Sequence, residues 1–191
     1  MLEYIFYLFT LWFKIIVNTF INIHIIWITL PLYLVWFTTE IFQEKKETSY
    51  GNAATNGVIT AYVGLDWIRQ MIMRNVAFSL EKLFIAIITI SYGIFVTFEA
   101  IKKKPVAKYL GRIKYVNYFQ IMFTVLVYSE YTGIAFNLDS MLAILIGFPI
   151  IWLITKLLDK YLPDITEEKI EETTKFDIYG GDSYNWSRWG R

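Results

Sequence analysis

Hydrophobic residues form long continuous runs along this chain, separated by short polar segments. The first run covers residues 2–42, and its only ionisable side chains are those of Glu3, Lys14, His24 and Glu40. Further apolar runs cover residues 83–98, 115–128 and 141–158. A helix that crosses the roughly 30 Å hydrocarbon layer of a membrane needs about 20 mostly apolar residues. The pattern therefore predicts an all-α, polytopic helical membrane protein.

About six transmembrane helices are expected from these runs. The predicted spans cover residues 3–21, 24–42, 57–75, 82–100, 115–134 and 138–158. The number falls to five if the 57–75 segment does not cross, or if the first helix lies in the plane of the membrane instead. Beyond the last span, Pro163, Asp164 and Glu167 predict the capped start of a short soluble helix. The expected domains are a helical bundle over residues 1–160 and a soluble acidic helix with a Gly- and aromatic-rich tail over residues 161–191.

The third predicted span is the least apolar, and small residues recur along it. They are Ala53, Gly57, Ala61 and Gly64. Small residues at a spacing of about four let two helix backbones approach closely inside a bilayer. We therefore expect this face to pack against another helix, which would shield it from lipid.

Four polar residues within the first and third spans are the candidates for an intramembrane polar pair or path. Asp66 and Arg69 share a helix face at i, i+3, so they can form an ion pair. At mid-depth of a 57–75 span, the charge of Asp66 costs about 2.5–3.5 kcal/mol. In the first span Thr10, Lys14, Asn18 and Asn22 form one narrow polar stripe, which makes Lys14 a further candidate partner for Asp66.

Positive charge is concentrated in the loop between the fourth and fifth predicted spans. Its six basic residues are Lys102, Lys103, Lys104, Lys108, Arg112 and Lys114, with no acid between Glu99 and Glu130. An excess of Lys and Arg in a short loop marks the cytoplasmic side, and such a loop can bind anionic lipid headgroups. With six spans, a multi-pass protein of the cell membrane would have both termini in the cytoplasm.

Composition narrows the possible functions. The chain has no cysteine, one histidine and a net charge of +1, and it carries none of the common catalytic or nucleotide-binding motifs. We therefore expect no catalytic residues, no metal, no cofactor and no nucleic-acid partner, and we expect that the protein is not an enzyme. Its abundant Ile, Phe, Tyr, Asn and Lys are typical of AT-rich prokaryotic or viral genomes.

The favoured function is that of a membrane subunit or scaffold. It would pack with partner membrane proteins, or with itself, through small-residue helix faces and a cytoplasmic tail in which Tyr184, Trp186 and Trp189 suit partner docking. Two alternatives stay open. One is a small channel or transporter with Lys14, Asn18, Asp66 and Arg69 along its path. The other is an intramembrane enzyme that acts on a lipid-linked substrate.

Overall fold

The computed structural model of the chain describes residues 2–42 and 48–161, and these residues form helices and no strand. The predicted helix after Pro163 and the aromatic tail lie outside the described residues. In chain order the helices are α1 (Leu2–Ile21), α2 (Ile23–Phe42), α3 (Tyr50–Ile72), α4 (Leu80–Ile101), α5 (Pro105–Leu110), α6 (Ile113–Val127), α7 (Ser129–Thr132) and α8 (Leu138–Tyr161).

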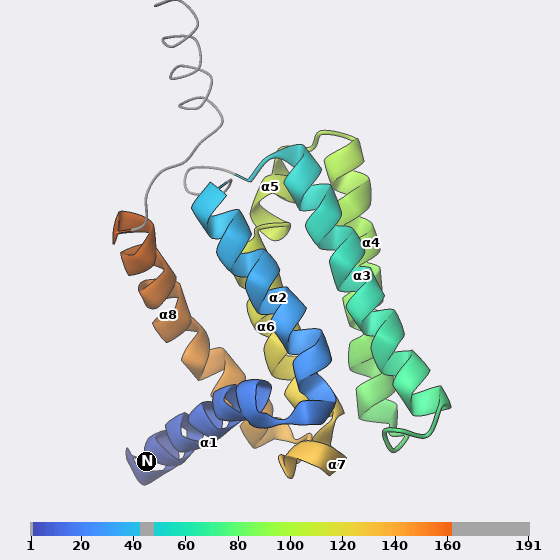
Figure 1. Ribbon diagram of the computed structural model, residues 1–191, viewed down its shortest axis with the longest axis vertical. Coiled ribbons are helices and arrows are strands. Elements are labelled where there is room, and N and C mark those ends of the chain that lie inside the picture. Colours follow the sequence, from blue (N-terminus) through green and yellow to red (C-terminus); the bar gives the residue numbers. More distant parts are fainter. Residues whose placement is uncertain (1, 43–47, 162–191) are drawn as a thin grey trace, which may run out of the picture.

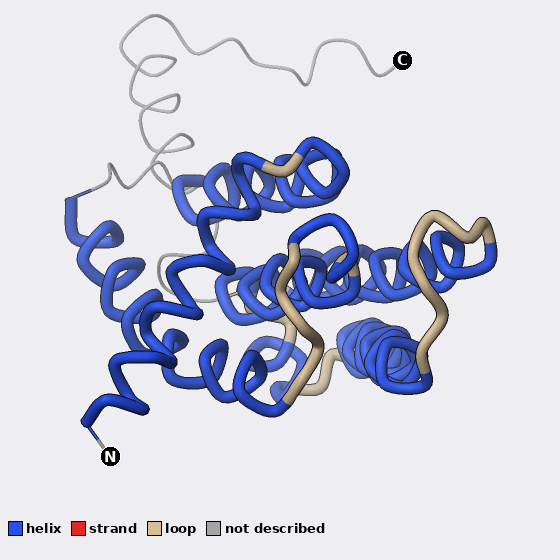
Figure 2. Tube along the Cα trace, turned by 90° about the horizontal axis from the view of Figure 1, so that it is seen from below, coloured by secondary structure: helices blue, strands red, loops and turns tan. Residues whose placement is uncertain are grey.

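Helix α6 forms the centre of the bundle. It packs against α1, α2, α3 and α8, and most of its side chains are buried. Figure 1 shows α2, α3, α4, α6 and α8 running side by side, with the end of α2, the start of α3, the α4–α5–α6 connection and the end of α8 at the upper end. The view from below shows only short loops between neighbouring helices in the part of the chain that is described (Figure 2).

Helices α3 and α4 form a tightly packed antiparallel hairpin. Each begins at a serine cap. The side chain of Ser49 accepts a hydrogen bond from the backbone N–H of Asn52 at 3.0 Å, and that of Ser79 accepts one from Lys82 at 3.2 Å. Because the first turn of a helix has unpaired N–H groups, such caps define where the helix starts.

Helix α1 lies obliquely at the lower end of the bundle, beside α8 and the start of α2 (Figure 1). Contacts at both of its ends agree with this placement. Near its start, the hydroxyl of Tyr4 donates to Asp139 at the beginning of α8. Just past its end, the side chain of Asn22 donates to the backbone oxygen of Tyr131 in α7. Both partners lie at the lower end of the bundle, so α1 does not run from one end of the bundle to the other.

Four of the described helices are long and apolar enough to cross a membrane. These are Leu2–Ile21, Ile23–Glu40, Leu80–Ile101 and Leu138–Leu157. The structure thus fits a helical membrane protein, but the count of about six spans is not confirmed. Helix α3 is not among the four, since it is the least apolar of the long helices. Helix α6 has 15 residues, which at a rise of 1.5 Å per residue is about 22 Å of helix.

Candidate functional site

A stripe of buried polar side chains runs along the central helix α6 and ends at the residue that follows it. Its members, spaced three or four residues apart on one side of the helix, are Lys114, Asn117, Gln120, Thr124 and Tyr128, and all are buried. Polar groups buried in a membrane bundle are costly unless they find partners. The partners of this stripe lie on α2 and α3, and the resulting contacts run from the upper end of the bundle to the lower end.

At the upper end, Lys114 forms a buried ion pair with Glu40 of α2. The Lys114 Nζ lies 3.4 Å from Glu40 Oε1, and the two side chains are only 6% and 5% exposed. Lys114, which was predicted to bind lipid headgroups with the rest of the basic loop, is thus buried inside the bundle. Lys114 belongs to the first turn of α6, and that turn faces α2 rather than the surface.

In the middle of the stripe, amide and hydroxyl groups join α6 to both neighbours. The side chain of Asn117 donates to the backbone oxygen of Leu32 in α2 at 2.7 Å. The Gln120 Nε2 donates to the hydroxyl of Thr60 in α3, also at 2.7 Å. One turn further, the indole N–H of Trp67 donates to Thr124 Oγ1 at 3.2 Å. These bonds fix how α6 is rotated about its axis relative to α2 and α3.

At the lower end, the stripe meets the ion pair that the sequence predicts. Arg69 Nε donates to Asp66 Oδ1 at 2.9 Å, and the hydroxyl of Tyr128 lies 3.4 Å from Asp66 Oδ2. The side chain of Asp66 is 9% exposed and that of Arg69 is 55% exposed. Along α3, Asp66 lies nearer the lower end than the middle. Helix α3 starts at Tyr50 and ends at Ile72, so Asp66 lies about 9 Å from its lower end at 1.5 Å per residue.

A groove between α2 and α3 opens beside this ion pair. It has a volume of about 380 Å³ and is lined by polar and aromatic residues that include His24, Trp27, Tyr62, Asp66, Arg69 and Tyr128. His24 comes from the start of α2, where its ring stacks on Tyr131 with centroids 4.0 Å apart. The groove thus combines an apolar wall with one charged end.

The structure does not bring Lys14 to Asp66. Lys14 is exposed on α1, and the side-chain contacts of Asp66 are with Arg69 and Tyr128. The side chain of Asn18 donates to the backbone oxygen of Lys14 within the same helix at 3.0 Å. The four residues predicted as one polar path therefore lie as two separate pairs, one on α1 and one on α3.

The small residues of α3 lie against α4 and α5. A Cβ atom on Gly57 would come within 2.7 Å of the Gly93 backbone oxygen, and one on Gly64 within 2.9 Å of that of Ala86. Gly93 in turn lies against the backbone nitrogen of Ala61. Above them, Gly111 at the end of α5 contacts the Cα of Ala53. The small residues of α3 therefore all pack against other helices of the same chain.

The basic loop is divided between the surface and the interior. Lys102, Lys103 and Lys104 are exposed, and the Lys102 ammonium lies 3.9 Å from the centre of the Phe98 ring. Lys108 lies 5.1 Å from the ring centre of Tyr50, and Arg112 occupies the N-cap position of α6 without a capping hydrogen bond from its side chain. Lys114 is the buried member of the basic loop.

The predicted docking residues Tyr184, Trp186 and Trp189 lie outside the described residues.

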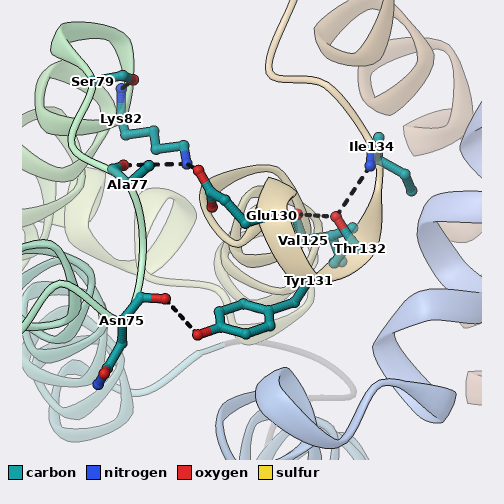
Figure 3. Close-up of polar contacts among 9 residues, drawn as sticks. All are labelled: Asn75, Ala77, Ser79, Lys82, Val125, Glu130, Tyr131, Thr132 and Ile134. Atoms are coloured by element: carbon teal, nitrogen blue, oxygen red, sulfur yellow. Dashed lines mark hydrogen bonds and ion pairs between the residues drawn. The ribbon is translucent and has the colours of Figure 1, made fainter.

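A second group of polar contacts joins the α3–α4 turn to α7 (Figure 3). The buried Lys82 Nζ lies 2.6 Å from Glu130 Oε1 and 3.4 Å from the backbone oxygen of Ala77. Beside it, the Tyr131 hydroxyl donates to the backbone oxygen of Asn75 at 2.5 Å. These contacts hold the lower end of the hairpin against the end of α6.

Sequence reasoning missed the α6 stripe, although the signal was present. Lys114, Asn117, Gln120, Thr124 and Tyr128 recur every three or four residues, as the polar residues of the first helix do. Aromatic and aliphatic residues between them make the segment appear uniformly apolar.

Among the described residues, no group of three His, Asp or Glu side chains is placed to hold a metal ion.

Comparison with protein-family models, with curated proteins and with solved structures gives no match to this chain.

Proposed function

We propose that this protein is an integral membrane subunit or scaffold, and that a helix of a partner membrane protein lies along the exposed face of α3. The observation that carries the proposal is the character of this face. Its exposed residues recur at intervals of three and four positions and are Gly51, Thr55, Val58, Tyr62, Leu65, Arg69 and Ile72.

Contact between the exposed face of α3 and lipid is unfavourable, because this face carries polar groups. Thr55, Tyr62 and Arg69 place a polar group on it every seventh residue, and Tyr62 is 69% exposed. Exposed polar groups in a bilayer favour helix–helix contact over lipid contact, because a second helix can pair with them. Tyr, Trp and Arg are also the residues that most often dominate protein interfaces. Here they occur together around the groove at Trp27, Tyr62 and Arg69.

The small-residue face of α3 supports a different role from the predicted one. Since Gly57 and Gly64 already contact α4, they stabilise the subunit itself rather than its contact with a partner. A partner helix would instead contact the larger side chains on the opposite face of α3. The cytoplasmic tail remains part of the proposal as a second docking element.

Site-specific photocrosslinking in native membranes tests this proposal. A photoreactive phenylalanine analogue replaces Tyr62, and the matched control carries it at Phe95, an exposed aromatic position of α4. We expect a discrete adduct with a second polypeptide at position 62 and only lipid adducts at position 95. An adduct of twice the chain's mass would identify a second copy as the partner. Lipid adducts alone at both positions would contradict the proposal.

The orientation of the bundle can be tested on this cysteine-free chain. The basic loop predicts that the upper end is cytoplasmic, and from α1 at the lower end we infer an N-terminus on the opposite side. We expect an impermeant maleimide to label Phe78→Cys, Ala135→Cys and Leu2→Cys from outside intact cells and to leave Val106→Cys unlabelled. Protection of Leu2→Cys alongside labelling of Phe78→Cys would mean that α1 crosses the membrane.

A small channel or transporter is the second candidate function, and the α6 stripe favours it. Polar groups follow one another from Lys114 to Tyr128 and reach the Asp66–Arg69 pair. If this stripe carries an ion or proton, Asp66→Asn should abolish flux into liposomes while the protein stays folded. If the pair is structural, we expect Asp66→Asn to lower the melting temperature modestly, since Arg69 is half exposed. Flux that is present and unchanged in Asp66→Asn would exclude Asp66 from the path.

A further inference from the structure

A second cavity lies between α3, α4 and α6. Its volume is about 260 Å³, and aromatic side chains make up much of its wall. They are Trp67, Tyr92, Tyr115, Phe119 and Phe123. A neighbouring recess of about 560 Å³ shares Tyr92, Tyr115 and Phe119 with it and continues toward Trp152 of α8.

One polar atom of a residue that lines this cavity lacks a hydrogen-bond partner. Gln120 is 3% exposed, and its Oε1 has no partner, while its Nε2 donates to Thr60 at 2.7 Å. The Thr60 hydroxyl already donates to the backbone oxygen of Asn56 at 2.6 Å, so toward Gln120 it can only accept. The amide is therefore oriented with its nitrogen toward Thr60 and its oxygen free.

Three donors around the cavity are already in use. The Tyr92 hydroxyl donates to the backbone oxygen of Leu110, the Thr89 hydroxyl to that of Ile85, and the Trp67 indole to Thr124. A buried acceptor without a donor is costly in an apolar setting. A molecule that supplies a hydroxyl to Gln120 Oε1 removes that cost.

The depth of Gln120 in the bundle restricts the kind of molecule that can bind in the cavity. Gln120 is the middle residue of α6 (Ile113–Val127), far from both ends of the bundle. The acyl chains of ordinary phospholipids carry no donor, and their polar groups remain at the headgroup layer. An occupant needs an apolar body that fits an aromatic wall, and a single hydroxyl that can reach the interior.

We propose that this cavity binds a lipid-soluble alcohol, whose hydroxyl donates to Gln120 Oε1 and whose apolar part packs on Trp67, Phe119 and Phe123. This site is separate from the partner docking on α3, because Thr60 and Trp67 line it from the buried side of α3 whereas docking uses the exposed side. A ligand seated here contacts α3, α4 and α6 together, and would therefore stabilise the hairpin against the central helix.

Photolabelling of the full-length protein in lipid nanodiscs tests the proposal. The probes are a diazirine-bearing octanol and its methyl ether, which has the same body but no donor. We expect the alcohol to label the cavity-lining segments of α3, α4 and α6 saturably, with an affinity about tenfold higher than that of the ether, as expected for one buried hydrogen bond. Equal labelling by the two probes would overturn the proposal and leave water or an acyl chain as the occupant.

Three substitutions sharpen the test. Gln120→Leu is expected to remove the preference for the alcohol, whereas the matched control Gln70→Leu, on the groove side of α3, keeps it. If Gln120→Leu folds poorly, Val116→Phe replaces it, because the added ring fills the cavity that Val116 lines. Saturable labelling that persists in Val116→Phe, or a preference that survives Gln120→Leu, contradicts the site.

Discussion

Gly57→Leu is expected to disrupt the α3–α4 hairpin and to reduce the amount of folded protein sharply. At this position even a Cβ atom would lie 2.7 Å from the Gly93 backbone oxygen and 2.9 Å from the Thr97 backbone nitrogen. Backbone atoms of a packed helix cannot move aside as a flexible side chain can. Overpacking of this kind typically costs about 1–3 kcal/mol and occasionally more. We expect the upper part of this range, measured as a fall in melting temperature of the purified protein.

Gly51→Leu provides the matched control on the same helix. Gly51 is exposed, and the nearest atom to a Cβ there is the hydroxyl oxygen of Ser49 at 3.8 Å, an ordinary contact distance. Leucine also has the better helix propensity. We therefore expect this variant to match or slightly exceed the parent in stability. Equal behaviour of Gly51→Leu and Gly57→Leu would mean that α3 and α4 do not approach as closely as the structure has them.

Lys114→Met is expected to be the most destabilising change among the ion pairs. It removes the cation that lies 3.4 Å from the buried Glu40 carboxylate, and breaking a buried pair from one side typically costs about 3–5 kcal/mol. The double change Glu40→Leu with Lys114→Met removes both charges, so we expect it to recover most of the lost stability. Thermal unfolding of the two single variants and the double variant forms the cycle that measures the coupling.

Lys102→Met is the control for the general effect of losing a basic residue. Lys102 is exposed at the same end of the bundle and lies over the Phe98 ring, so its replacement should change stability little. If Lys114→Met is as mild as Lys102→Met, then Glu40 has access to water and the pair is not buried.

Several features of the fold could be predicted because they depend on local sequence. Long apolar runs indicate helices of membrane type wherever they occur, since a helix is the spanning segment that satisfies its own backbone. The Asp66–Arg69 pair could be predicted because residues at i, i+3 share a face in any helix. The small residues of α3 indicated a closely approaching neighbour, but not which helix that neighbour is.

Errors arose where the prediction needed the rotation of a helix about its axis. Lys114 was grouped with the surface lysines because it follows them in sequence, yet it begins a new helix whose first turn faces α2. The α6 stripe was overlooked for a related reason. A helix that is mainly apolar all round has no strong preference for which side faces lipid. Which side of it packs inward is decided by the hydrogen-bond partners that its few polar residues find on neighbouring helices.

The sequence alone determined that the chain folds as membrane-type helices, and approximately where most of them lie, because hydrophobicity and caps act over one helix at a time. Tertiary structure decided three further points. It placed α1 obliquely at the lower end of the bundle, separated Lys14 from Asp66, and buried the polar stripe of α6 between α2 and α3. These outcomes depend on contacts between residues tens of positions apart. Such contacts are set by how whole helix surfaces fit together and not by the composition of any one helix.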